Sequence, residues 1–365
     1  MTTVADIIRL IEAIAPLSLQ ESYDNAGLLT GGRDMEVKAA VVCIDVTEDV
    51  IDEAIAMGAN LVISHHPLVF RGLKNLTGKD YVERTLIKAI KNDIAIYSAH
   101  TNLDNAQGGV NFKMAEMLGL QNVSVLAPMS GQLLKLVTYV PIDEVDNVRE
   151  ALFGAGAGCI GNYDCCSYNS NGFGTFRAGE KAEPYCGTIG ELHRETETRI
   201  EVIVPRHCRS RVLKALLATH PYEEPAFDLI PIENDWAQAG SGVIGEFMGE
   251  LDELDFLGRL KSVFKCGCVR HTALTGRKVR RVALCGGSGS FLIPQAISAE
   301  VDAFVTGEIK YHEFFGHEDT ILLADIGHYE SEQYTKDIFC EIITKKIPTF
   351  ACYYTKVETN PINYL

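Results

Sequence analysis

Apolar residues in the first third of the chain alternate between helical spacing and short unbroken runs. Residues 4–15 show the spacing of one helical face, and their apolar members are Val4, Ile7, Ile8, Ile11 and Ile14. Residues 39–46, AAVVCIDV, form a short run rich in β-branched residues, which is typical of a strand buried on both faces. Further helices are expected at 49–58, 81–93 and 110–120, and further strands at 60–67 and 94–104. This alternation predicts parallel strands joined by right-handed helical crossovers.

The pattern changes from about residue 133 to residue 234. Two strand-then-helix units and a closing strand are expected there, at 135–141, 143–156, 198–205, 210–221 and 227–232. Further extended segments separate the two units, an order that suits a ferredoxin-like α+β domain. From about residue 240 the alternation of helical spacing and short apolar runs returns. Strands are expected in 280–290, 301–310 and 320–333, and helices from Pro294 and at 311–315. We therefore expect an α/β body, 1–130 plus 236–365, with parallel-rich sheets covered by helices on both sides, interrupted by an inserted domain, 131–235.

Composition narrows the class of protein. Hydrophobic residues make up 47% and charged residues 22%, as in ordinary globular chains rather than disordered ones. The formal net charge of −16 disfavours nucleic acid as a partner. No apolar run approaches the roughly 18 residues of a membrane span, and Asp6, Arg9 and Glu12 interrupt the first segment, so a cytoplasmic protein without a membrane partner is expected. The eleven scattered cysteines are interpreted as reduced, mostly buried thiols.

Five expected strands end in polar or glycine-rich segments. In parallel α/β sheets, ligands bind in the crevice outside the carboxyl ends of the strands, so segments distant in sequence are expected to meet there. The five segments are 64–67 (SHHP), 100–104 (HTNLD), 286–289 (GGSG), 306–308 (TGE) and 325–328 (DIGH).

Imidazoles and carboxylates dominate this predicted crevice. His328 and Glu332 are four residues apart at the start of an expected helix, and so lie on one face. The adjacent His65 and His66 are weak evidence by themselves, but the turn forced by Pro67 can aim both at the crevice. Imidazole with carboxylate suits Zn²⁺, Fe²⁺, Mn²⁺ or Ni²⁺ rather than Ca²⁺ or a thiolate cluster. The alternative is that the histidines are hydrogen-bonded in a polar core.

Other polar residues give weaker indications of a functional site. Glu308 and His312 are expected at helical spacing and are the tentative acid and base, or else a surface pair. His100 is a candidate for orienting a ligand, whereas Asp24 is by default a capping or turn residue. The segments 286–289 and 220–225 fit turns at least as well as ligand sites. The pairs Cys165 with Cys166 and Cys266 with Cys268 have no matching second pair for a metal.

Together, several segments resemble one known family. These are YDNAGLLTG (23–31), SHHPLVF (64–70), SAHTNLD (98–104), GGSGS (286–290), TGEIKYHE (306–313) and DIGHYESE (325–332). They resemble the Nif-three-like family, also labelled GTP cyclohydrolase 1 type 2 homologues. The central stretch, notably HPYEEPAFD (220–228), looks like the CutA-like and P-two-like extra domain of the longer bacterial members. The resemblance covers nearly the whole chain.

The resemblance implies a site for two divalent metal ions, with Zn, Fe or Mn expected. The family's ligands fall here on His65, His66, Asp104, His328 and Glu332, and Glu332 would bridge the ions. The resemblance also implies a toroidal homohexamer with the sites facing an internal cavity. Five ligands exceed the needs of one tetrahedral zinc with an open position, so two metals are also the better count from the residues alone.

Two functions follow as expectations. The first is a metal-dependent hydrolase of GTP cyclohydrolase type, in which a metal-bound hydroxide attacks a nucleotide-like small molecule. The alternative is a regulatory or scaffold hexamer that senses a metal or a metabolite through its inserted domain, without turnover.

Overall fold

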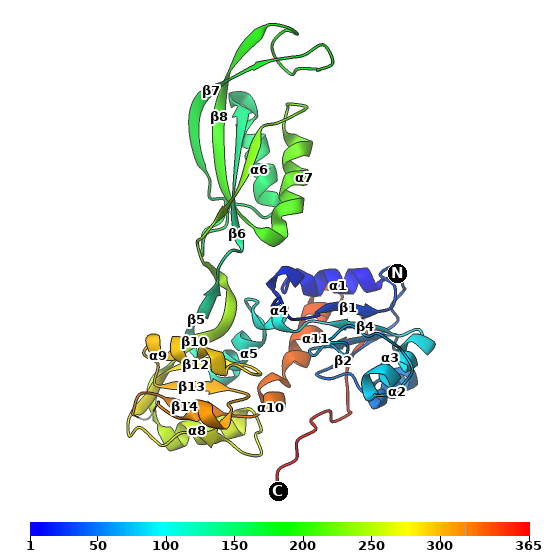
Figure 1. Cartoon of the computed structure of the whole chain (residues 1–365), viewed down its shortest axis with the longest axis vertical. Helices are drawn as coiled ribbons and strands as arrows, with labels where there is room; N and C mark the ends of the chain where they lie inside the picture. The colour runs from blue at the N-terminus through cyan, green and yellow to red at the C-terminus, as the bar shows by residue number, and fades with distance from the viewer. Residues whose placement is uncertain (318) are drawn as a thin grey trace. The chain divides into compact units, whose positions relative to one another are not determined.

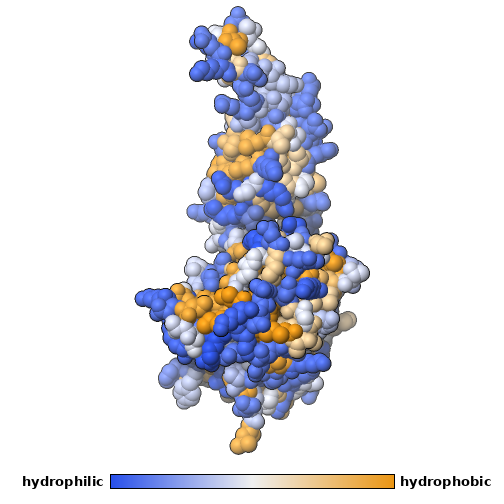
Figure 2. Space-filling view, turned by 90° about the vertical axis from the view of Figure 1, so that its right-hand side faces the viewer, coloured by the Kyte–Doolittle hydropathy of each residue, from blue (hydrophilic) through white to orange (hydrophobic). Residues whose placement is uncertain are grey.

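The computed structural model describes residues 1–317 and 319–365. They form two compact units, which we call the body, Met1–Pro128 with Gln238–Leu365, and the insert, Met129–Ala237. The sequence predicts the bounds 130/131 and 235/236 for the inserted domain, and these stay a prediction. No helix in the described part of the chain is long and apolar enough to cross a membrane. On the face drawn in Figure 2, orange apolar areas occur on both units, with blue polar residues around them.

The first sheet of the body has the order β1-β4-β3-β2-β15. Strands β2, β3, β4 and β15 run parallel and β1 is antiparallel to β4, and every residue of β2, β3 and β4 is buried, as their apolar runs predict. The strands are β1 (Gly27–Thr30), β2 (Ala40–Cys43), β3 (Leu61–Ser64), β4 (Ala95–Ser98) and β15 (Cys352–Tyr354). The helices near this sheet are α1 (Val4–Glu12), α2 (Glu48–Met57), α3 (Tyr81–Lys91) and α11 (Thr335–Lys346) (Figure 1).

The second sheet of the body has the order β11-β14-β13-β12-β10-β5. Strands β12, β13 and β14 are parallel, whereas β11 and β10 pair antiparallel at either side of them. The strands are β5 (Gln121–Met129), β10 (Trp236–Asp252), β11 (Arg270–His271), β12 (Lys278–Cys285), β13 (Ala303–Thr306) and β14 (Leu322–Asp325). The helices are α5 (Val110–Leu118), α8 (Glu253–Val263) and α9 (Ile293–Ser298), and buried residues of α5 and α8 pack with β12 in one core cluster. The chain thus enters the insert from β5 and returns to the body through the neighbouring strand β10.

The insert is a four-stranded antiparallel sheet with two helices. Its elements are β6 (Leu133–Pro141), α6 (Val145–Gly154), β7 (Tyr168–Arg177), β8 (Leu192–Pro205), α7 (Arg209–Thr219) and β9 (Phe227–Ile232). The sheet order β7-β8-β6-β9 together with the chain order βαββαβ is the ferredoxin-like arrangement, so this prediction is confirmed. Both helices cover one face of the sheet (Figure 1), where buried residues of β6 and β8 pack with α6 and α7.

Two predicted elements differ from the structure. Strand β4 ends at Ser98, and HTNLD forms instead the short helix α4 (Thr101–Asp104). The cause is a pair of long-range contacts: the Asn102 side chain donates to Ala15 O and that of Asn105 to Leu19 O, which draws the chain away from the sheet. The helix expected at 311–315 is a 3-10 turn, η5 (Tyr311–Phe314), and Glu308 precedes it. Glu308 and His312 therefore do not share a helical face.

The remaining short elements connect the main ones. They are η1 (Leu17–Leu19), η2 (Ile142–Glu144), η3 (Arg206–Cys208), η4 (Ser290–Leu292) and α10 (His328–Glu332). Helix α10 begins right after Gly327, whose φ of 94° is a left-handed conformation that favours glycine. The structure joins no two of the eleven cysteines, and five of them are buried, so the expectation of mostly buried thiols holds for about half and that of reduced thiols stays a prediction.

Candidate metal centre

The predicted crevice exists in the body, at the carboxyl ends of strands from both of its sheets. His65 and His66 directly follow β3, and Asp104 ends the helix α4 that follows β4. His328 and Glu332 are the first and last residues of α10, which follows β14. The structure thus brings together five side chains from three segments separated by up to 267 positions in the sequence.

His65 is fixed in the form that binds cations. Its Nδ1 lies 2.9 Å from Ala99 O, and because a carbonyl oxygen only accepts, Nδ1 must carry the proton. The lone pair of Nε2 is therefore free, 3.6 Å from Asp104 Oδ1 and 3.5 Å from Glu332 Oε1. Both His65 Nε2 and Asp104 Oδ1 are buried without a hydrogen-bond partner, an arrangement that is costly unless a cation lies between them.

Glu332 joins two groups of possible ligands. Its Oε1 faces His65, while its Oε2 lies 2.9 Å from His66 Nε2 and 3.3 Å from His328 Nε2. The ligand atoms of His65, Asp104 and Glu332 lie within 4.8 Å of one another, and so do those of His66, His328 and Glu332. The two triads share one carboxylate, whose side chain is 3% exposed.

The charges of the cluster favour a bound cation. Burial opposes ionisation of Glu332, but the histidines outweigh burial and hold its pKa well below the usual range. Burial and the charge of Glu332 raise the pKa of Asp104 well above its usual range, and burial lowers the pKa of His65. Without a cation, two buried carboxylates repel each other and compete for protons. The donor set of nitrogen and carboxylate oxygen therefore fits divalent metal ions.

Neighbouring polar groups hold the ligands in place. Asp45 Oδ1 lies 2.7 Å from His66 Nδ1, so Nε2 of that ring is aimed at Glu332, as carboxylates often orient metal-binding histidines. Burial opposes protonation of His66, but Glu332 and Asp45 raise its pKa to about 10. Ser331 Oγ accepts from Gly287 N at 2.9 Å and ties α10 to the segment after β12. Asp45 was not predicted as a site residue from the sequence, although it too follows a buried strand, β2.

His100 forms a second polar pair beside the triads. Its Nδ1 lies 2.8 Å from Asp24 Oδ1, and Asp24 Oδ2 accepts from the backbone N and the Oγ1 of Thr101. The ring of His100 is edge-on to those of His65 and His66, with centroids 5.3 and 5.4 Å away. Asp24 thus caps α4 and orients His100 at once. Burial opposes its ionisation, but these hydrogen bonds lower the pKa of Asp24 to about 2.

A cavity of about 460 Å³ opens onto this cluster. Its wall includes Asp104, His328 and Glu332 from the triads, His100, and the aromatic Tyr23 and Phe291. A small organic molecule in this space would contact both the possible metal ligands and an apolar surface, as in most ligand sites.

Glu308 and His312 occupy different surroundings. Glu308 Oε2 lies 3.6 Å from Nδ1 of His328, on the side of the ring away from Glu332, which suits a group that orients the ring. His312 is exposed and its ring contacts those of Tyr311 and Phe315. Their assignment as acid and base stays a prediction.

The segments 286–289 and 220–225 form hydrogen bonds within the fold. In the GGSG segment, Gly286 N donates to Asn111 Oδ1, Gly287 N to Ser331, and Gly289 N to Thr306 Oγ1, so these amides are not available to a phosphate. His220 Nε2 donates to Tyr139 O and its Nδ1 accepts from Tyr222 N, as expected of a structural corner. Among the described residues, the clusters of possible metal ligands include neither cysteine pair noted from the sequence.

Comparison with known proteins identifies the family. Residues 2–361 match the family model of Duf34/NIF3 (NGG1p interacting factor 3). The chain belongs to the Duf34/NIF3 family. A family member from Halalkalibacterium halodurans, named GTP cyclohydrolase 1 type 2 homolog, is 38% identical over 366 residues that cover 98% of each chain. A relative of the same name from Bacillus subtilis is 36% identical over 371 residues, again covering 98% of each.

Solved Duf34/NIF3 structures share the fold. The Bacillus cereus protein related to NIF3 is 37% identical, with a TM-score of 0.86 and coverage of 100% of this chain and 99% of that one. A Staphylococcus aureus protein with 31% identity has a TM-score of 0.77 at the same coverage. A CutA protein from Archaeoglobus fulgidus overlaps 28% of the chain at a TM-score of 0.22, so the ferredoxin-like fold of the insert is taken from its own topology.

Gly287 provides a test of the packing around Glu332. A Cβ on Gly287 would lie 2.3 Å from Glu332 Oε1, so Gly287→Ala is expected to displace the carboxylate and weaken metal binding at least about tenfold. Gly58→Ala is the matched control, because Gly58 is also left-handed, with φ of 67°, but has no atom within 4 Å of a Cβ. Metal content after dialysis, measured by mass spectrometry, compares the two. Equal metal loss in both variants would contradict the packing argument.

Proposed function

We propose that the body binds two divalent metal ions, one in each triad, with Glu332 shared between them. The two unpaired atoms in the first triad, His65 Nε2 and Asp104 Oδ1, support one ion. The convergence of His66 Nε2 and His328 Nε2 on one carboxylate oxygen, with 3.4 Å between the two nitrogens, supports the other. Three protein ligands per ion leave positions open for water and substrate.

Single variants test the two-ion count. Asp104→Asn is expected to leave one ion per chain, His328→Ala is expected to leave the other, and Glu332→Gln is expected to lose both. Glu250→Gln serves as the control and keeps both ions, because Glu250 is exposed on β10 and belongs neither to the triads nor to the wall of the cavity beside them. Inductively coupled plasma mass spectrometry of the purified proteins gives the counts. If Asp104→Asn and His328→Ala both retain the metal content of the parent protein, the ligand assignment is wrong.

The function that this site supports best is hydrolysis of a nucleotide-like small molecule. The observation behind it is the pair of triads around the buried Glu332, which opens onto a cavity of about 460 Å³ with aromatic residues in its wall. Two cations in these positions would polarise a substrate oxygen and lower the pKa of water. The substrate class comes from the name of the relatives, GTP cyclohydrolase 1 type 2 homolog.

The chain's own groups would position substrate and move protons. His100 gives its Nδ1 proton to the hydrogen bond with Asp24, which leaves Nε2 as a proton acceptor beside the triads, in the way a carboxylate prepares a catalytic histidine. Tyr23 and Phe291 offer ring faces on which a purine can stack. For proton transfer, this geometry favours His100 over His312.

Turnover assays test the enzyme proposal. The metal-loaded protein is incubated with GTP and a panel of other purine nucleotides, and products are identified by mass spectrometry. We expect a product in the parent protein, none with Glu332→Gln, and at least about a hundredfold lower kcat with His100→Gln. His312→Gln is the matched control and should retain activity. Absence of turnover across the panel, with both ions bound, would contradict the enzyme.

The second candidate function is a sensor or scaffold without turnover. It is favoured by a cavity of about 690 Å³ in the insert, since a hydrolytic site in the body does not need a second ligand-sized space. As the resemblance implies, we also propose a homohexamer in either case, for which the apolar surface areas in Figure 2 offer contact area.

Removal of the insert separates the two functions. Because β5 and β10 are neighbours in one sheet, a short linker between Pro128 and Gln238 should leave the body folded. Light scattering with size-exclusion chromatography is expected to show six copies of the parent chain. If the shortened chain keeps its turnover, the catalytic proposal is supported; a hexamer with metal but no turnover in the parent chain would favour the sensor. A monomeric parent protein would contradict the assembly proposal.

A further inference from the structure

The insert contains a second cluster of ligand side chains, outside the body and its triads. Cys186 Sγ, a ring nitrogen of His193 and a carboxylate oxygen of Glu195 lie within 4.8 Å of one another. The His193 Nε2 to Glu195 Oε2 distance is 2.8 Å, and both side chains are about a quarter exposed. The cluster therefore combines a thiol, an imidazole and a carboxylate at the edge of a folded unit.

The β-sheet supplies two of the three groups. His193 and Glu195 are two residues apart on β8, so their side chains point to the same face. In the antiparallel pairing with β7, Phe176 lies opposite His193 and Gly174 opposite Glu195. The Phe176 ring contacts that of His193, at 5.2 Å between centroids, and limits the orientations open to it. Both ligands are thus held by regular structure.

The third group comes from the segment that joins β7 to β8. Gly187 follows Cys186 with φ of 83°, and a Cβ there would lie 2.8 Å from Cγ of His193. Glycine at this position lets the backbone rest directly on the imidazole, which places the preceding cysteine beside it. Gly190 N donates to Ala178 O at 2.9 Å and closes the segment. The approach of Cys186 to His193 is therefore built into the backbone of the loop.

We propose that Cys186, His193 and Glu195 bind one Zn²⁺-class divalent cation. Thiolate and imidazole donors select zinc and its neighbours in the periodic table over calcium and magnesium. Donor atoms around a tetrahedral zinc lie roughly 3.3–3.8 Å apart, given metal–ligand bonds of about 2.0–2.3 Å, so the three groups need to move by only about 1 Å. The cation displaces the thiol proton and replaces the hydrogen bond between His193 and Glu195.

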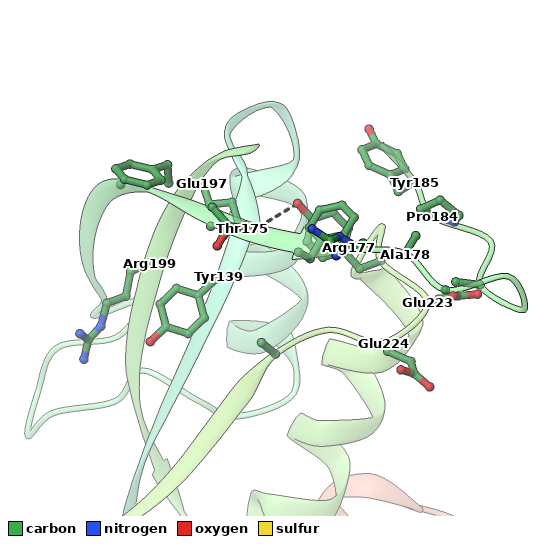
Figure 3. A pocket seen from close by; sticks show the side chains of 18 of the residues that line it. Tyr139, Thr175, Arg177, Ala178, Pro184, Tyr185, Glu197, Arg199, Glu223 and Glu224 are labelled. Atoms are coloured by element: carbon green, nitrogen blue, oxygen red, sulfur yellow. Dashed lines mark hydrogen bonds between the residues drawn. The ribbon is translucent and has the colours of Figure 1, made fainter. Parts of the chain in front are cut away.

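The cluster adjoins the cavity of the insert through shared neighbours, although none of its three ligands belongs to the cavity wall. Tyr222 and Phe176 belong to the cavity wall and also touch the cluster, with Tyr222 Oη 4.0 Å from Cys186 Sγ. In Figure 3 the wall residues Pro184 and Tyr185 lie on the segment just before Cys186, whereas Glu197 comes from β8.

Cobalt spectroscopy of the full-length protein tests the proposal. Co²⁺ added to metal-stripped protein is expected to give a thiolate-to-cobalt charge-transfer band in the near ultraviolet. Cys186→Ser should abolish the band, and His193→Ala and Glu195→Gln should weaken Co²⁺ binding at this site at least about tenfold. Cys159→Ser, which changes an exposed cysteine of the same unit, is the matched control and should retain the band.

Two further measurements keep the outcome clear. Trp236, the single tryptophan of the chain, stacks on His207 within the insert, at 5.5 Å between centroids, so its fluorescence reports whether the insert of each variant is folded. Glu332→Gln should keep the band, because the triads of the body contain no cysteine, and this separates the proposal from that for the body. Absence of the band in the folded parent protein, or its persistence in Cys186→Ser, would overturn the proposal.

Discussion

The centre of the body depends on one buried carboxylate that faces two groups of nitrogen ligands. Glu332 is 2% exposed, and its two oxygens are directed at His65 on one side and at His66 and His328 on the other. A buried charge of this kind is tolerated only when compensated, and the compensation comes from both sheets of the body. The geometry of the crevice therefore follows from the requirement that positive charge or hydrogen-bond donors compensate the buried carboxylate of Glu332.

The rest of the body keeps these groups in position. Asn111 accepts from Gly286 N and donates to Asp104 O, so one side chain on α5 links the loop after β12 to the end of α4. Asp325 accepts from the amides of Ile309 and Gly327 and fixes the turn before α10. Rigid supports of this kind determine whether a metal site keeps its geometry.

Much of this arrangement was predictable because the carboxyl ends of parallel strands meet. The apolar runs at 39–46 and 60–67 indicated β2 and β3, and their polar successors pointed to the crevice. The sequence did not show that two separate sheets contribute, since the pairing of distant strands leaves no local signal. The helix over HTNLD was missed because Asn102 and Asn105 bond to carbonyls more than 80 residues away, and local propensity does not contain such contacts.

In the insert, too, contacts between residues distant in the sequence could not be predicted. Its order of strands and helices followed from periodicity, but Cys186, His193 and Glu195 come together only through the path of a loop that glycine permits. The cysteine pairs that stood out by spacing, Cys165 with Cys166 and Cys266 with Cys268, do not take part. Spacing in sequence predicts a site well within one helix or strand and poorly across a loop.

The position of α10 near the end of the chain has a consequence for biosynthesis. His65 leaves the ribosome long before Glu332, and β15, which pairs with β2 in the first sheet, is made later still. Until Glu332 has been translated, the imidazoles of the amino-terminal half have no carboxylate from the other half to face. The two triads can therefore form only after residue 332 has left the ribosome, and chains terminated before it lack the shared carboxylate.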